Sequence, residues 1–254
     1  VYMDSRVYVN GQFVGHYPSG YNHFSYDITE FLNKDGSENS ITVQVTNKQP
    51  SSRWYSGSGI YRDVTLSYRD KVHVAENGNH ITTPKLAEQK EGNVETQVQS
   101  KIKNTDKKAA KVFVEQQIFT KEGKVVSELV RSETKNLAEN EVADFRQTIL
   151  VNKPTLWTTK SYHPQLYVLK TKVYKEGQLV DVTEDTFGYR YFNWTAKEGF
   201  SLNGERMKFH GVSIHHDNGA LGAEENYKAT YRKLKLLKDM GVNSIRTTHN
   251  PASP

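Results

Sequence analysis

The stretch LKDMGVNSIRTTHNP, residues 237–251, carries the strongest indication of how this chain folds. Its first residues read as the end of a helix, with Gly241 placed where helices often end in a glycine. The segment VNSIRTTH that follows, residues 242–249, reads as a strand. The helix itself is predicted from apolar side chains that recur every three or four positions, namely Tyr227, Tyr231, Leu234, Leu237 and Met240.

Another strand is predicted upstream of this helix. The segment MKFHGVSIHHD, residues 207–217, follows a hairpin signal at Asn203-Gly204 and alternates in polarity. Strand, helix and strand then follow one another within about 40 residues. This order is typical of a βαβ unit, whose two strands run parallel. We therefore expect the last part of the sequence to open an α/β domain that is not completed by residue 254.

Composition excludes several classes of protein. The chain has 254 residues, a formal net charge of +5 and no cysteine, which excludes disulfides, thiol chemistry and Cys-based metal sites. No apolar run of about 18 residues occurs, so no transmembrane segment is expected. The densest basic run, KIKNTDKKAAK at Lys101–Lys111, contains no aromatic residue. We interpret it as a solvated strand–turn–strand edge and not as a nucleic-acid surface.

Residues 1–70 are predicted to form an antiparallel, sandwich-like domain of short strands. The segment RVYVNGQFVGHY alternates on both sides of Asn10-Gly11, which is a strong hairpin signal. The segments FSYDITEFL, SITVQVTN and IYRDVTLSY extend the strand-like pattern to residue 68.

Residues 71–190 are predicted to form an immunoglobulin-like β-sandwich. Four segments alternate regularly between turn clusters: NVETQVQSKIKN, AKVFVEQQIFT, VADFRQTILV and LYVLKTKVYK. Between the last two, NKPTLWTTKSYHPQLYVL has two prolines that bracket a tryptophan, which fits a crossover between sheets. The remaining residues, 191–254, are then the start of the α/β domain.

Polar side chains gather where the two predicted parallel strands end. His215, His216 and Asp217 follow the first strand, and Arg246, His249 and Asn250 follow the second. Any one of these residues could be an ordinary exposed loop residue, but two clusters at equivalent strand ends favour a site. Metal ligation is not expected, because adjacent histidines in an extended chain point opposite ways and no HExxH motif is present.

The loop RWYSGSGIYR is a second candidate. Arg53, Trp54 and Tyr55 suit a sugar, because an aromatic face can pack on the apolar C–H side of a pyranose ring. Alternatively, Trp54 fills the core of its own sandwich. The sequence leaves both interpretations open.

Five segments resemble glycoside hydrolase family 2, and its β-galactosidase branch most closely. VYVNGQFVGHYPSGYNHFSYDIT and RWYSGSGIYRDVTL resemble the family's N-terminal sugar-binding jelly roll, and the resemblance implies that residues 1–70 are a partial jelly roll without its first strands. FGYR, at Phe187–Arg190, resembles the end of its immunoglobulin-like middle domain. FHGVSIHHDNGALGA and LKDMGVNSIRTTHNP resemble the opening of its catalytic (β/α)8 TIM barrel. The resemblance covers essentially the whole chain and looks closest to the large surface-attached β-galactosidases of streptococci.

The resemblance implies a mainly β fold and a retaining exo-β-galactosidase, acting through two glutamates about 5 Å apart. Both glutamates are expected beyond Pro254, so this chain would be an internal fragment that contains no catalytic residue and is inactive alone. Arg246 would lie beneath the nucleophile and keep it ionised, while His215 and His249 would bind galactose hydroxyls. The resemblance also implies sugar-binding roles for further residues, namely Asp217, Asn250, Arg53 and Trp54.

Several alternatives remain open within and beyond this family. β-Glucuronidase and β-mannosidase are the rivals inside the family, and HHDNGALGA favours galactose. A non-catalytic carbohydrate-binding module is the alternative outside it. A carbohydrate is the only partner expected, with no cofactor, no metal and no nucleic acid. Location at the cell surface, attached to the wall or secreted, is implied by resemblance alone, and the cytoplasm is the alternative. Glu224 and Glu225 are interpreted as first-turn charges of the helix and not as catalytic groups.

Overall fold

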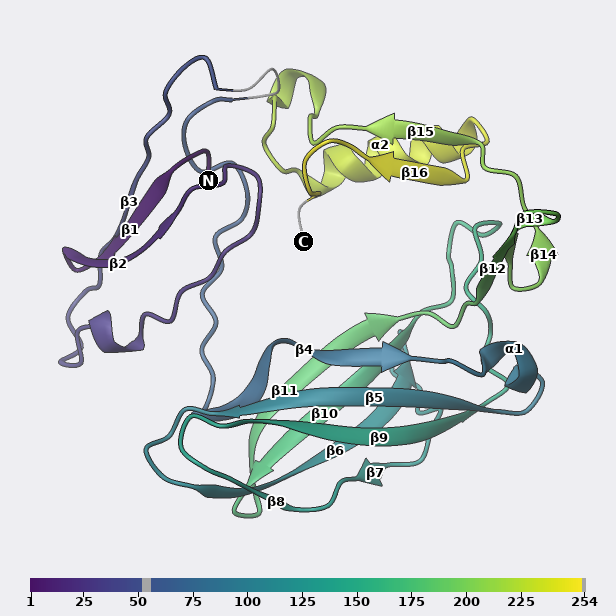
Figure 1. Ribbon diagram of the computed structural model, residues 1–254, viewed down its shortest axis with the longest axis horizontal. Coiled ribbons are helices and arrows are strands. Elements are labelled where there is room, and N and C mark those ends of the chain that lie inside the picture. Colours follow the sequence, from purple (N-terminus) through teal and green to yellow (C-terminus); the bar gives the residue numbers. More distant parts are fainter. Residues whose placement is uncertain (52–55, 253–254) are drawn as a thin grey trace. The chain divides into compact units, whose positions relative to one another are not determined.

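The computed structural model describes residues 1–51 and 56–252 of the chain (Figure 1). The chain folds into two compact units. The first unit combines Val1–Leu66 with Phe209–Pro254, and the second unit comprises Ser67–Lys208. Among the described helices, none is long and apolar enough to cross a membrane.

The second unit is built on two antiparallel sheets, as the alternation predicts. One sheet has the order β4-β5-β9, and the other has the order β11-β10-β6-β7, with β8 also paired to β6. A short helix, α1 (Leu86–Gln89), follows β4. The strands are β4 (Val72–Thr82), β5 (Asn93–Asn104), β6 (Ala110–Thr120), β7 (Val130–Arg131), β8 (Lys135–Leu137), β9 (Val142–Asn152), β10 (Tyr167–Lys175) and β11 (Gln178–Phe187). The prediction of an immunoglobulin-like sandwich is confirmed, and residues 153–166 make the crossover from one sheet to the other.

The interior of this sandwich contains two apolar clusters separated by a polar layer. One cluster includes Phe145 and the other includes Leu169, both almost fully buried. Between them, the Gln116 side-chain amide donates to Ser100 Oγ at 2.8 Å and to Thr171 Oγ1 at 2.9 Å, and all three residues are buried. Since Ser100 is on β5 while Gln116 and Thr171 are on β6 and β10, these bonds tie the two sheets together.

The basic run at residues 101–111 forms the predicted strand, turn and strand, but the prediction that it is a sheet edge is wrong. β5 is the middle strand of its sheet, because β4 and β9 pair with its two sides. In the turn, Asp106 accepts hydrogen bonds from Lys71 at 3.3 Å and from Lys175 at 2.9 Å. Lys71 and Lys175, which lie outside the basic run, therefore neutralise a carboxylate that joins three segments of the sandwich.

A small antiparallel sheet ends the second unit. It consists of β12 (Phe192–Thr195), β13 (Gly199–Leu202) and β14 (Glu205–Arg206). Asn203 and Gly204 connect the last two strands with φ values of 55° and 84°, as a tight hairpin of this kind requires. This hairpin prediction is confirmed.

In the first unit, the strands β1 (Ser5–Val9), β2 (Gln12–Tyr17) and β3 (Ile41–Gln44) form a sheet in the order β2-β1-β3. The predicted hairpin is present, and Asn10 and Gly11 both have positive φ, 50° and 79°.

Two other strand predictions in this region are wrong. FSYDITEFL contains only a 3-10 turn, Thr29–Phe31, and IYRDVTLSY forms no strand. The apolar side chains of the latter segment point into solvent, since Val64 is 72% exposed and Leu66 is 78% exposed. Alternation of apolar and polar residues is not enough to form a strand, because a strand also needs a neighbouring strand that satisfies its backbone hydrogen-bonding groups. No described strand pairs with this segment.

The predicted βαβ unit is confirmed. β15 (Gly211–Ile214) pairs in parallel with β16 (Ser244–Thr247), and α2 (Tyr227–Asp239) connects them after a 3-10 turn at Gly219–Leu221. The two strands approach closely at Gly211, because a Cβ there would lie 2.5 Å from Ser244 Oγ and 3.3 Å from the Ser244 carbonyl oxygen.

Helix α2 is delimited by its own capping residues. Asn226 accepts a hydrogen bond from the Ala229 amide at 3.0 Å. At the other end Gly241 has φ 89°, and the amides of Gly241 and Val242 donate to carbonyls of the last turn. Glu224 and Glu225 precede this N-cap, so their interpretation as first-turn charges is wrong. The predicted apolar face is largely exposed, most of all at Tyr227 and Met240.

Candidate functional site

The β15-β16 pair presents one polar face and one apolar face. In the parallel register Ser213 lies opposite Arg246, so both side chains are on one face of the pair. The intervening residues Val212, Ile214 and Ile245 alternate onto the other face. The sequence thus places mainly apolar side chains on one face of the pair and Ser213 and Arg246 on the other.

Just beyond the strands, His215 and His249 come together. Their ring centroids are 5.2 Å apart, with 34° between the ring planes. Buried Thr248 fixes this arrangement, because its amide donates to the Ile214 carbonyl at 2.9 Å and carries the pairing of the strands one residue further. The two histidines predicted to bind one ligand are therefore neighbours.

The adjacent His216 points to a different set of neighbours, as expected for consecutive residues in an extended chain. Its Nδ1 lies 3.4 Å from the amide nitrogen of Asn250. Its ring packs against those of Tyr21 and Tyr61, with centroid distances of 5.6 and 6.3 Å. Burial, and then the charge of Arg62, lower the pKa of His216, which favours a neutral imidazole near pH 7.

The loop after β15 is held by backbone contacts. Lys233 on α2 donates from its ammonium group to the Asp217 carbonyl. Asn218 donates from its side chain to the Glu224 carbonyl at 3.1 Å and from its amide to the Gly222 carbonyl at 2.8 Å. These contacts tie the Asp217 backbone to α2 and close the loop at Asn218.

Arg246 is exposed at the end of the polar face. Within the described part of the chain, no carboxylate lies at ion-pair distance from its guanidinium group. An arginine in such a position can pair with an acidic group from another segment or with a ligand. Arg53, Trp54 and Tyr55, which the sequence also suggests as sugar contacts, lie outside the described residues.

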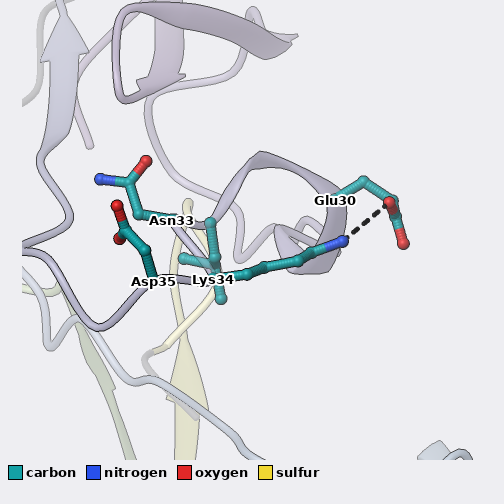
Figure 2. A pocket seen from close by; sticks show the side chains of 5 residues that line it. Glu30, Asn33, Lys34 and Asp35 are labelled. Atoms are coloured by element: carbon teal, nitrogen blue, oxygen red, sulfur yellow. Dashed lines mark hydrogen bonds and ion pairs between the residues drawn. The ribbon is translucent and has the colours of Figure 1, made fainter.

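Two surface hollows occur elsewhere. Figure 2 shows one in the loop at residues 30–35, where Lys34 forms an exposed ion pair with Glu30 at 3.4 Å. The other is in the second unit and is lined by Trp157, Arg190, Phe192, Phe200 and others. None of the predicted site residues lines either hollow. No group of three or more potential metal ligands occurs within residues 1–51 and 56–252.

Sequence reasoning missed the residues that surround the strand ends from the N-terminal segment. Tyr21, Tyr61 and Arg62 belong to this set. Tyr61 and Arg62 lie in the candidate loop RWYSGSGIYR but were given no role, and His216 was placed in the strand-end cluster without a sugar-binding role. The available signal was the aromatic and arginine content of SGYN and GIYR. It could not be used, because no local pattern shows that segments about 150 to 200 residues apart along the chain come together.

Three family models match successive parts of the chain. The model for the sugar-binding domain of glycosyl hydrolases family 2 matches residues 1–70. The model described simply as glycosyl hydrolases family 2 matches residues 72–190. The model for the TIM barrel domain of that family matches residues 195–254.

The names of similar proteins give two kinds of activity. A β-galactosidase of Bacteroides ovatus is 40% identical over 255 residues, covering 100% of this chain and 29% of that protein. A β-glucuronidase of Bacteroides fragilis is 28% identical, covering 96% of this chain and 36% of that protein. The chain thus spans about a third of the length of such relatives.

Solved structures agree with the sequence matches. A glycosyl hydrolase family 2 member from Bacteroides cellulosilyticus superposes with a TM-score of 0.92 at 35% identity, covering 100% of this chain and 32% of that one. A β-glucuronidase from Bacteroides uniformis superposes with a TM-score of 0.82 at 28% identity, covering 98% of this chain and 30% of that one. The sheets, the parallel strand pair and these matches together show that the chain belongs to glycosyl hydrolases family 2.

Proposed function

We propose that the full-length protein is a retaining exo-β-galactosidase that removes terminal β-linked galactose from glycans. The observation that carries this proposal is the parallel β15-β16 pair, which brings Arg246, His215 and His249 to one end of two adjacent strands. Sites of (β/α)8 barrels are built at this end of their strands.

In the proposed reaction, a glutamate carboxylate from outside this chain attacks the anomeric carbon of the sugar. The glycosidic C–O bond breaks as a second glutamate donates its proton to the leaving oxygen, and a water molecule then hydrolyses the glycosyl ester with that second residue acting as base. Arg246 supports the first step, because a nearby guanidinium keeps the attacking carboxylate ionised. This chain supplies positive charge and hydrogen bonds, and it supplies neither glutamate.

The residues around Arg246 are proposed to hold the sugar. Imidazole and amide nitrogens donate hydrogen bonds to hydroxyl oxygens, which suits His215, His249 and Asn250. Asp217 would accept from a hydroxyl group. Arg53 and Trp54 are proposed to contact the sugar at the rim.

The identity of the sugar is the finer part of this proposal. It rests on the resemblance of HHDNGALGA to galactosidases and on the similarity to a β-galactosidase at 40% identity. β-Glucuronidase is the second candidate, because β-glucuronidases are also among the similar proteins and solved structures. The two substrates differ at C4 and C6, so side chains that read these groups decide between them.

A panel of nitrophenyl glycosides tests the proposal on the full-length protein. We expect kcat/KM for the β-galactoside to exceed that for the β-glucuronide and the β-mannoside by tenfold or more. A preference for the glucuronide would overturn the assignment to galactose. Absence of turnover on all three would overturn the glycosidase proposal.

The variant Arg246→Ala tests the role of the strand-tip arginine. We expect kcat for the preferred glycoside to fall by about 10²–10³-fold, as when a preorganised electrostatic contact is removed from an active site. Arg232→Ala is the matched control, since Arg232 is exposed on α2, and it should leave kcat within twofold of wild type. A near-normal rate for Arg246→Ala would remove this residue from the site.

The 254-residue chain alone distinguishes an enzyme fragment from a binding module. We expect it to release no nitrophenol above a buffer blank, because neither glutamate is present. Calorimetric titration with galactosides should show no binding at millimolar concentration if the residues described above make only part of a site. Millimolar or tighter binding without turnover would favour the carbohydrate-binding module instead.

A further inference from the structure

Arg62 joins the N-terminal segment to the loop that follows β16. Its Nη1 donates to the Tyr21 carbonyl at 2.8 Å, and its Nη2 donates to the Pro251 carbonyl at 2.6 Å. One guanidinium group thus holds two backbone segments about 230 residues apart in the sequence. Both acceptors are backbone carbonyls, so the contact fixes the path of the main chain.

The residue next to Arg62 makes further contacts of the same kind. Tyr61 donates from its hydroxyl to the Gly20 carbonyl at 2.6 Å. Its own carbonyl accepts from the Glu225 amide at 3.1 Å, just before helix α2. The guanidinium carbon of Arg62 lies 5.2 Å from the centroid of the Tyr61 ring. This pair of residues therefore anchors residues 20–21, the start of α2 and the loop after β16.

The second anchored carbonyl is close to the proposed sugar contacts. Pro251 directly follows Asn250, which is bonded to His216, and the His216 ring packs on Tyr21. The contacts form a closed circuit, because Arg62 also holds the Tyr21 carbonyl. A shift of the Arg62 side chain would therefore be passed to the loop that carries His249 and Asn250.

The geometry points to Arg62 as a positioning residue for sugar binding, which acts through the Pro251 carbonyl and does not touch the sugar. This inference rests on the proposed function, because the loop matters for catalysis only if it binds substrate. The planar fork of the guanidinium group can donate to two carbonyls at once in a fixed direction, whereas a lysine ammonium is a flexible point charge. We therefore expect lysine to replace arginine poorly here.

A purely stabilising role predicts different kinetics. If Arg62 only stabilised the fold, its removal would lower the fraction of active enzyme and hence the apparent kcat, with KM unchanged. If it positions the loop, the folded enzyme would bind the sugar less well, and KM would rise. The split between KM and kcat therefore separates the two roles.

The test uses the full-length protein with Arg62→Ala, Arg62→Lys and the control Arg6→Ala, since Arg6 is exposed on β1. For the preferred nitrophenyl glycoside, we expect KM to rise about tenfold in Arg62→Ala and at least threefold in Arg62→Lys, with no change in the control. KM values within twofold of wild type in both Arg62 variants would overturn the inference. If Arg62→Ala does not fold, Arg62→Lys alone decides.

Hydrogen exchange of the peptide covering residues 245–252 gives a readout that does not need activity. We expect it to accelerate at least threefold in both Arg62 variants, while peptides of β5 and β9 exchange as in wild type. Unchanged exchange of residues 245–252 would also overturn the inference. If the wild-type protein hydrolyses no glycoside, the proposed function fails, and this exchange measurement still decides whether Arg62 holds the loop.

Discussion

The sandwich at residues 72–187 and the βαβ segment at residues 209–252 both contain regular secondary structure, but they differ in how far the side chains of their strands and helices are buried. In the sandwich, alternate residues of β5 are buried along the whole strand. In the βαβ segment, α2 has no fully buried residue, and its apolar side chains are exposed at Tyr227, Tyr231 and Met240.

The difference shows that local signals and burial are separate requirements. Helix α2 is specified by its N-cap at Asn226 and its C-terminal glycine at Gly241, and both act within a few residues. Stability from burial requires a second surface, which the sandwich provides for itself through two facing sheets. The described part of the βαβ segment contains no such second surface over α2, so the apolar side chains of this helix stay exposed.

The largest expected contrast between the two regions comes from truncating one aromatic residue in each. Phe145 is 1% exposed in the sandwich, whereas Tyr231 is 56% exposed on α2. We expect Phe145→Ala to lower the free energy of unfolding of the sandwich by about 3–5 kcal/mol, because it removes buried contacts and leaves a cavity. Tyr231→Ala should change the stability of its own unit by less than about 0.5 kcal/mol.

Hydrogen exchange with increasing urea measures both effects in the 254-residue chain. The slowest amides of β5, β6 and β9 report the unfolding of the sandwich, and the amides of α2 report the βαβ segment. A loss below about 1 kcal/mol in Phe145→Ala would contradict a tightly packed sandwich. A loss above about 2 kcal/mol in Tyr231→Ala would show that α2 is covered more fully than its exposure indicates.

A smaller loss of stability is expected when Asn79 is truncated. Asn79 extends the polar layer of the sandwich through its bond with Ser100, and the described βαβ segment contains no such layer. The Asn79 side chain donates to Asp185 Oδ2 at 2.6 Å and to Thr183 Oγ1 at 3.1 Å, and it accepts from Ser100 Oγ at 2.5 Å. Asn79→Ala would leave the buried Ser100 hydroxyl without this acceptor, so we expect a loss of about 1–3 kcal/mol. Exposed Gln97 on β5 gives the control Gln97→Ala.

The same exchange measurement applies to these variants. If Asn79→Ala lowers the free energy of unfolding no more than Gln97→Ala does, the polar layer contributes to the specificity of strand pairing but not to stability.

Four strands of the sandwich, β5, β6, β9 and β10, could be predicted almost to the residue, because each repeats one local rule, whereas β4, β7, β8 and β11 were not among the predicted segments. The predicted segments 93–104 and 110–120 coincide with β5 and β6. The edge prediction for residues 101–111 failed, because strand order is set by contacts distant in sequence and leaves no mark on the alternation itself. The predicted division of the chain at residues 70 and 190 stays a prediction.

The candidate site could be predicted only for residues that belong to the βαβ unit. His215 and His249 were predicted to share a site from their equivalent places after parallel strands, and their rings are neighbours. Arg62 was not predicted, because IYRDVTLSY looks like one more alternating strand. In the structure, the side chains of Tyr61 and Arg62 donate hydrogen bonds to carbonyls of other segments. The periodicity of the local sequence does not predict such long-range contacts.

The smallest expected effect concerns the charge of Asp106 at the surface of the sandwich. Arg246 of the βαβ segment is the contrasting case, because no carboxylate lies at ion-pair distance from it among the described residues. The carboxylate of Asp106 accepts from Lys175 and Lys71, and these contacts lower its pKa from 3.8 to about 2, against a smaller opposing effect of burial. A carboxyl group with a lowered pKa stabilises the folded state at pH values above its unfolded pKa. That contribution is lost as the pH falls from about 3.8 through about 2.

We therefore expect Asp106→Asn to be less stable than wild type at pH 6, and we expect most of the difference to be lost near pH 2, where about half of the folded carboxyl groups are protonated. Urea midpoints of the sandwich amides at both pH values measure it, with Glu133→Gln as a control at an exposed position of the same unit. A difference that persists at pH 2 would mean that Asp106 acts through hydrogen-bond geometry and not through its charge. The comparison between Asp106 and Arg246 would then lose its basis. It assumes that Asp106 stabilises the sandwich through its ion pairs, whereas Arg246, without an ion pair among the described residues, adds no such stability.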